Sequence, residues 1–199
     1  MKDFYTITKT SNGISQIPID SKLFESRNIY IEGNISSESA VLAVKQIHLL
    51  NLEDDSKPVN LFINSNGGEI TAGMLIYDAI QGSKCPVNTI CLGNAYSMGA
   101  VLAACGTGKR YILPHSKMML HEPLISSSAS GSASSIKELS DSLNKTKNEM
   151  NGILSKHTGR PLKEVEEAAS YDHFYSAQEA LDFGLVDEIV NFSELWEVL

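Results

Sequence analysis

The stretch Val87-Asn88-Thr89-Ile90-Cys91-Leu92-Gly93-Asn94-Ala95-Tyr96-Ser97-Met98-Gly99-Ala100 decides the fold. Residues 87–92 have the composition of a buried strand, and the apolar run that follows Ser97 predicts a buried helix. Glycines on both sides of Ser97 mark the passage from one to the other. A strand that runs straight into a helix is typical of βαβ units. The stretch therefore predicts an α/β fold with a mainly parallel sheet.

The same rhythm extends in both directions. We expect strands at residues 28–31, 59–63, 111–113 and 117–120, and a helix over about 71–81. Gly33 and Asn34 suggest a turn, after which Ser36 caps a helix that runs to about residue 52. Val41, Val44 and His48 are expected on its buried face. No repeat or domain boundary is evident, so residues 1–199 are predicted to form one domain.

The ends and the middle carry local signals. Residues 11–13 suggest a turn between two extended arms, and the Ser-rich residues 125–135 suggest an extended, mobile segment. A long helix is predicted over about 136–156, ended by Thr158-Gly159-Arg160-Pro161. A capping box from Ser176 to Glu179, with Gly184 as the stop, predicts a helix over about 177–183, followed by a strand near residue 189.

Composition excludes several classes of protein. The chain has a net charge of −8 and no run of Lys and Arg, which argues against a nucleic-acid partner. No stretch of about 18 apolar residues could span a membrane, and the first residues lack the apolar core of a signal peptide. The three cysteines suit neither a disulfide framework nor a zinc site, so we expect a cytoplasmic protein with no metal or cofactor.

Ser97 is the first candidate for chemistry. A serine at the start of a buried helix sees the partial positive charge of unpaired N–H groups, which would stabilise an oxyanion. Gly67 and Gly68, at the end of the preceding strand, let the backbone approach a ligand. The alternatives are equally simple: Ser97 as an ordinary helix cap, and the Gly-Gly pair as an ordinary turn.

His121 and Asp172 complete one possible constellation. His121 ends an apolar strand and could take a proton from a serine, whereas the other four histidines lie in a helix, in turns or at a helix end. An acid is needed to orient such a base, and Asp172 could serve. The residue pattern alone does not prefer Asp172 to Asp78 or Asp187.

The ordered set of motifs resembles the family of Clp protease proteolytic subunits, ClpP. The elements that carry the resemblance are Ile63-Asn64-Ser65-Asn66-Gly67-Gly68, Ile70-Thr71-Ala72-Gly73-Met74, Ala95-Tyr96-Ser97-Met98-Gly99-Ala100, Leu113-Pro114-His115-Ser116, Met119-Leu120-His121-Glu122-Pro123, His157-Thr158-Gly159 and Asp172-His173-Phe174-Tyr175-Ser176-Ala177. The resemblance implies a serine endopeptidase with Ser97 as nucleophile, His121 as base and Asp172 as the third member. It also implies that the backbone N–H groups of Gly68 and Met98 form the oxyanion hole.

The resemblance further implies a crotonase-like ββα spiral head with a helix-and-strand handle, here at about residues 123–157, and an N-terminal axial-loop segment at residues 1–20. Such subunits form heptameric rings that stack into a tetradecamer and receive unfolded proteins from an AAA+ Clp unfoldase, which uses the ATP. The unfoldase would dock in an apolar surface pocket that comprises Phe62, Ile90, Leu92, Tyr111 and Leu113.

Departures from the family pattern indicate a divergent paralogue. Asn66 replaces the usual proline, Tyr171 replaces an arginine that joins ring-to-ring ion pairs, and Glu122 replaces glutamine beside the base. Glu122 is expected to couple electrostatically to His121. Asn60 and Gly82 replace aromatic residues of the docking pocket. Two alternatives therefore stay open: a weakly active structural or regulatory subunit of a mixed ring, and an acyl-CoA enzyme of the crotonase type.

Overall fold

The computed structural model describes residues 4–10, 13–125 and 130–198. Within them, seven strands form the main sheet: β3 (Asn28–Ile35), β4 (Val59–Gly68), β5 (Val87–Tyr96), β6 (Arg110–Ile112), β7 (Lys117–Leu120), β8 (His173–Tyr175) and β9 (Glu188–Ile189). The path β3-β4-β5-β6-β9 is parallel throughout, β7 also runs parallel to β5, and β8 pairs antiparallel with β7. The α/β class with a mainly parallel sheet is confirmed.

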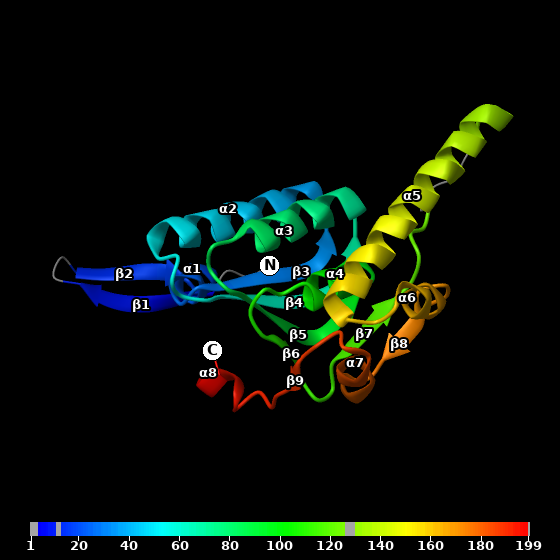
Figure 1. Ribbon diagram of the computed structural model, residues 1–199. Helices are drawn as coiled ribbons and strands as arrows, with labels where there is room; N and C mark the ends of the chain where they lie inside the picture. The colour runs from blue at the N-terminus through cyan, green and yellow to red at the C-terminus, as the bar shows by residue number, and fades with distance from the viewer. Residues whose placement is uncertain (1–3, 11–12, 126–129, 199) are drawn as a thin grey trace.

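Helices and a separate hairpin surround this sheet (Figure 1). The helices are α1 (Ile19–Glu25), α2 (Ser37–Glu53), α3 (Ile70–Gly82), α4 (Met98–Ala104), α5 (Ala133–Thr158), α6 (Leu162–Ala168), α7 (Ala177–Phe183) and α8 (Leu195–Val198). Helices α2 and α3 cover one face, and the start of α5 projects away from the body. The strands β1 (Tyr5–Thr10) and β2 (Gly13–Pro18) pair as the two expected arms, whose predicted tip at residues 11–12 lies outside the described residues.

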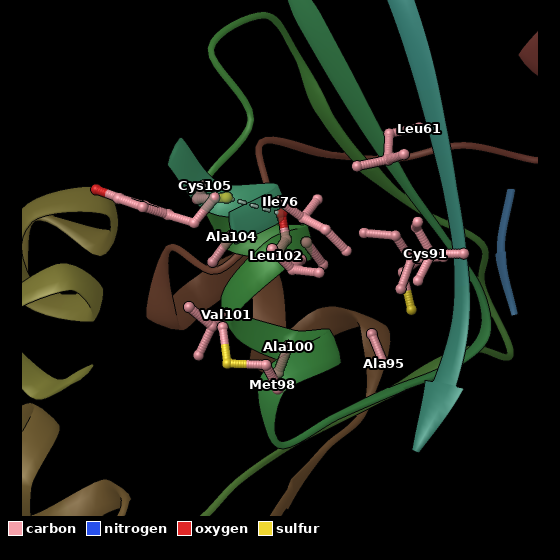
Figure 2. Close-up of a cluster of buried hydrophobic side chains, with 14 of the residues drawn as sticks. Leu61, Ile76, Cys91, Ala95, Met98, Ala100, Val101, Leu102, Ala104 and Cys105 are labelled. Atoms are coloured by element: carbon pink, nitrogen blue, oxygen red, sulfur yellow. Dashed lines mark hydrogen bonds between the residues drawn. The ribbon is translucent and has the colours of Figure 1, made fainter. Parts of the chain in front are cut away.

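The main core lies between the sheet and helices α2, α3 and α4. All seven residues of α4 are buried, and Figure 2 shows its side chains packed toward Ile76 of α3 and Cys91 of β5. The three cysteines are buried and free, as a role as small apolar residues predicts. Burial raises the pKa of Cys91 and of Cys105 to about 12. These thiols therefore stay protonated and unreactive at neutral pH.

Three strands extend further than the sequence indicates. The predicted turn at Gly33 and Asn34 is wrong, because β3 continues to Ile35 with a register shift between those two residues. Strand β4 likewise runs through to Gly68, and β5 to Tyr96, across glycines that were expected to end them. Glycine at such positions makes a bulge instead of an end, since the neighbouring strand keeps pairing beyond it.

The buried face of α2 also differs from the prediction. The side chains that pack inward are Ala40, Ala43, Ile47 and Leu50, whereas Val41 is 39% exposed and His48 is exposed. Small alanines let the helix lie close to its neighbours, so the packed stripe is displaced by one residue from the larger valines. The exposed stripe on α2 includes Val41, Leu42, Leu49 and Leu52.

Local capping signals were read correctly. The Ser36 side chain caps α2, and Ser176 and Glu179 form the reciprocal capping box of α7. Gly159 and Gly184 adopt the left-handed conformation that ends α5 and α7. Helix α5 begins at Ala133, so three residues of the Ser-rich stretch are helical, and 126–129 of that stretch lie outside the described residues. No helix in the described part of the chain is long and apolar enough to cross a membrane.

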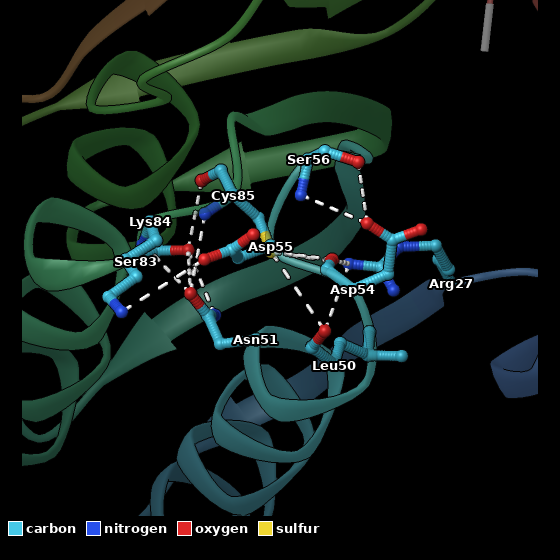
Figure 3. A network of polar contacts seen from close by, with 9 residues as sticks. All are labelled: Arg27, Leu50, Asn51, Asp54, Asp55, Ser56, Ser83, Lys84 and Cys85. Atoms are coloured by element: carbon cyan, nitrogen blue, oxygen red, sulfur yellow. Dashed lines mark hydrogen bonds and ion pairs between the residues drawn. The ribbon is translucent and has the colours of Figure 1, made fainter.

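Arg27 anchors the edge of the sheet where β3 begins. Its guanidinium donates to the carbonyl oxygens of Leu50, Asp54 and Pro58, at 3.2, 3.0 and 2.9 Å, and so ties the end of α2 to the entry of β4. Figure 3 shows this group beside Cys85 and the Asn51 amide, which in turn bonds the segment after α3. This network lies at the start of β4, whereas Ser97 follows the other end of the sheet, at the end of β5.

Candidate active site

Ser97 occupies a strained turn between β5 and α4. Its φ of 53° and ψ of −122° lie outside the regions that non-glycine residues normally adopt. Its backbone N–H donates to the Met119 carbonyl at 2.8 Å, and its own carbonyl accepts from Ala100 at 2.9 Å. A serine held on a strained strand-to-helix turn is characteristic of hydrolase nucleophiles, because the turn raises the hydroxyl above the sheet.

Glycines make this close packing possible. A Cβ added to Gly67 would lie 2.8 Å from the Ser97 Cβ, and one added to Gly99 would lie 3.0 Å from the Ser65 carbonyl. A Cβ on Gly68 would collide with the Ile35 backbone at 2.1 Å. The end of β4 therefore lies directly against the Ser97 turn, with no room for a side chain between them.

The register of β7 and β8 brings His121 and Asp172 together. Leu120 pairs with His173 in the last antiparallel step, so the next residues outward along the two strands are His121 and Asp172. His121 Nδ1 lies 3.2 Å from an Asp172 carboxylate oxygen, and His121 Nε2 lies 2.7 Å from Ser97 Oγ. The His121 side chain is 16% exposed, whereas that of Asp172 is 62% exposed. Asp78 and Asp187, the alternatives to Asp172, make no contact with His121; Asp187 instead pairs with Arg110.

The two predicted oxyanion donors flank Ser97. Met98 is the first residue of α4, where N–H groups have no partner within the helix. Gly68 lines the groove that contains Ser97 and His121. The N–H of the neighbouring Gly67 is already engaged, since it donates to Ser65 Oγ at 3.0 Å.

Two hollows meet at Ser97 and His121. An open groove of about 620 Å³ is lined by Asn34, Asn66, Gly68, Glu69, Ile70, Thr71, Ser97, His121, Pro123 and Leu124. A tight cavity of about 30 Å³ is lined mainly by apolar side chains, from Ile70, Met98, Val101, Leu120, Pro123, Met150 and Leu154. The groove has the shape for an extended chain, and the cavity has the chemistry for one apolar side chain.

Two residues of α5 near the site, Lys147 and Asn151, were missed in the sequence. Glu122 has a partner, Lys147 of α5, with Nζ 2.5 Å from its carboxylate. Asn151 is buried in the wall of the apolar cavity, and among the described residues its Nδ2 has no hydrogen-bond partner. Both follow from the period of α5, because residues 147 and 151 lie on the same side as Met150 and Leu154. The pairing of Lys147 with Glu122 could not be predicted from the sequence.

The five residues expected in a docking pocket gather on the other face of the sheet. Phe62, Ile90 and Tyr111 form a buried cluster against which Leu92 and Leu113 pack. This cluster also contains Val190 and Leu195 from the end of the chain, which the sequence did not indicate. Phe62, Ile90 and Tyr111 are therefore buried together with residues of the C-terminal segment, while Leu92 and Leu113 are half-buried beside them.

A serine, a histidine and a carboxylate in this order define a site of the hydrolase class. Comparison with known families agrees with that class: the sequence model of the Clp protease family matches residues 11–193 of the 199. The chain therefore belongs to the Clp protease family, and it is a protease of the ClpP type.

Proposed function

We propose that this chain is the proteolytic subunit of an ATP-dependent Clp protease and cleaves peptide bonds with Ser97, His121 and Asp172. The observation that carries the proposal is the 2.7 Å contact between His121 Nε2 and Ser97 Oγ on a strained turn. In acylation, His121 takes the hydroxyl proton as Ser97 Oγ attacks the substrate carbonyl carbon. The proton then passes to the leaving amine, and water releases the acyl group by the reverse sequence.

The two charges that develop in these steps, on the oxyanion and on the His121 imidazolium, are each stabilised by groups of the chain. The N–H groups of Gly68 and Met98 donate to the tetrahedral oxyanion, aided by the positive end of α4. Asp172 accepts from His121 Nδ1 and stabilises the imidazolium that forms. The apolar cavity beside Ser97 receives the side chain that precedes the scissile bond, so we expect cleavage after residues with apolar side chains.

The single chain leaves apolar surface exposed that suits contact with a neighbouring subunit. Family members work as rings with Clp ATPases, and we propose that this chain forms heptameric rings, stacked or mixed with another ClpP, in the cytoplasm. The exposed apolar stripe of α2 is a surface that a neighbour in the ring would cover. In the single domain, residues 1–20 serve as the axial segment and about 123–157 as the handle, and an AAA+ unfoldase delivers unfolded proteins.

Labelling with a fluorophosphonate tests the chemistry directly. The wild-type chain should be labelled and should hydrolyse a fluorogenic peptide, and Ser97→Ala should lose both, with hydrolysis reduced by about 10³-fold or more. Ser170→Ala, which removes an exposed hydroxyl from the turn after α6, is the matched control and should keep both activities. Labelling of Ser97→Ala at the wild-type rate would contradict the assignment of Ser97 as the nucleophile.

One observation favours the second candidate, a weakly active subunit of a mixed ring. The Asp172 side chain is 62% exposed and Tyr171 is 85% exposed, so within one chain little holds the acid in place. Tyrosine also lacks the guanidinium that could join a ring-to-ring ion pair. Analytical ultracentrifugation with a peptidase assay separates the two: poor activity and single rings favour the second candidate, whereas a stable, highly active double ring contradicts it.

A further inference from the structure

The face of the sheet opposite the main core carries a small apolar cluster of its own. Side chains alternate along β4, so Leu61 and Ile63 pack into the main core while Phe62 points to the other face. Phe62 joins Ile90 and Tyr111 there, on the side of the sheet away from α2 and α3, where α8 lies (Figure 1). This patch would be exposed if only the sheet and its connections covered it.

Leu195 completes the cover. It is the first residue of the four-residue helix α8, close to the end of the chain, yet it is 0% exposed. Its neighbours in the same segment behave in the opposite way: Phe192 and Trp196 are 56% and 55% exposed and pack edge to face on each other. One side chain of this segment is therefore inserted, and the rest of the segment lies outside.

Within the described part of the chain, no recorded hydrogen bond joins residues 191–197 to the sheet. The last hydrogen bond to the sheet is the one that Val190 N–H donates to the Ile112 carbonyl, at 3.1 Å. Beyond it, every hydrogen bond that the structure records for residues 191–197 joins two members of that stretch. The Glu194 carboxylate accepts from the backbone and side-chain nitrogens of Asn191. The turn is thus preformed, and withdrawal of Leu195 breaks no hydrogen bond to the sheet.

We propose that residues 191–198 are a built-in plug, in which Leu195 occupies the surface pocket of Phe62, Ile90 and Tyr111 until a partner segment of the same chemistry displaces it. The proposal rests on the proposed function, since the partner would be the unfoldase named there and the pocket is the one that the family resemblance implies for its docking. The shape of the plug defines the partner: a short turn that presents one bulky aliphatic side chain, held by its own hydrogen bonds. The partner can therefore dock only by competing with Leu195 for the pocket.

The strength of this competition follows from the buried side chain. Full burial of one leucine favours the closed state by a factor on the order of 10 to 100. A partner that binds only the open pocket loses affinity by the same factor, because its apparent affinity scales with the open fraction. Removal of the Leu195 side chain should therefore increase the partner's apparent affinity by about that factor. It should leave the active site on the other face untouched.

The chain carries its own reporter, since Trp196 is its single tryptophan and lies in the plug. The probe is a fluorescein-labelled peptide of residues 191–198 with Trp196→Phe, which leaves the protein tryptophan as the only one present. In anisotropy titrations, Leu195→Ser should bind this peptide about 10- to 100-fold more tightly than the wild-type chain does. Leu162→Ser, which changes an exposed leucine at the start of α6, should bind it as the wild type does.

A second measurement uses the wild-type chain alone. Saturating peptide should displace the plug and increase quenching of Trp196 by acrylamide, whereas a peptide with serine in place of leucine should not. Equal peptide affinity for wild type and Leu195→Ser, or quenching unchanged at saturation, would overturn the plug. Fluorophosphonate labelling of the same samples keeps the two proposals apart. Loss of labelling with peptide competition intact removes the peptidase assignment, and the reverse result removes only the plug.

Discussion

Gly67→Ala is the sharpest test of how the site is built. Gly67 has a φ of +96°, and an added Cβ would lie 2.8 Å from the Ser97 Cβ and 2.9 Å from the Tyr96 carbonyl oxygen. Both of those atoms belong to the turn that positions Ser97. Neither of these two atoms is the end of a flexible side chain. The end of β4 and the Ser97 turn must therefore move apart to accept one methyl group.

The cost has two parts. The positive φ costs an alanine about 1–2 kcal/mol. The overpacking adds about 1–3 kcal/mol of strain. The predicted loss of unfolding free energy is therefore about 2–5 kcal/mol. Displacement of Ser97 by a fraction of an ångström also lengthens its 2.7 Å contact with His121 Nε2. A misplacement approaching 1 Å costs about 10²-fold in rate, so kcat should fall by one to two orders of magnitude in material that is still folded.

Two other glycines separate the contributions. Gly33 has a φ of +67° with nothing within 4 Å of an added Cβ, so Gly33→Ala carries the conformational cost without the collision. Gly152 lies in α5 with open space around it, and Gly152→Ala should stabilise the helix by about 0.5–1 kcal/mol. Urea unfolding gives the stabilities, and hydrolysis of a fluorogenic peptide gives kcat. If folded Gly67→Ala matched Gly33→Ala in kcat, the packing argument for the Ser97 turn would fail.

Two further predictions concern charge. Glu122→Gln and Lys147→Ala should each cost at most about 1 kcal/mol of unfolding free energy, because the ion pair that they break is partly exposed. Urea unfolding of both variants and of the double variant tests this, and a double variant that loses the sum of the two single losses would show that the pair itself contributes nothing. Burial alone would raise the pKa of Asp187, but hydrogen bonds from Arg110 outweigh it and lower that pKa. The stabilisation is therefore present above the unfolded pKa, near about 4, and lost as pH falls through the folded value. Asp187→Asn should cost about 1–3 kcal/mol of unfolding free energy at pH 7 and progressively less toward pH 2, as measured by urea titrations across that range.

Local signals in the sequence predicted local structure well. The box formed by Ser176 and Glu179, and the left-handed stop at Gly184, involve residues within one or two helical turns, so their geometry follows from the sequence itself. Strand ends were less predictable, because β3 continues past Gly33, and β4 through Gly67 to Gly68, only where the neighbouring strand continues to pair. The buried stripe of α2 was misplaced because the choice between Ala40 and Val41 depends on what lies beneath the helix.

The site was predictable to different depths. Ser97 lies on a local turn, and the pattern of strand, glycine and helix indicated it. The choice of Asp172 over Asp187 needed the pairing of β7 with β8, a contact between residues about fifty positions apart that no local pattern records. Leu195 was invisible for the same reason, since nothing in residues 191–198 says which face of the sheet the end of the chain meets.

The two halves of the proposed triad differ in how firmly the fold holds them. Ser97 is fixed from both sides, through the Met119 carbonyl and through α4, and His121 is largely buried beside it. Asp172 follows an exposed turn and approaches Nδ1 at 3.2 Å with most of its side chain in solvent. An exposed ion pair contributes little by itself, at most about 1 kcal/mol. Ser97 and His121 are thus held firmly by the chain itself, whereas little within the described residues holds Asp172.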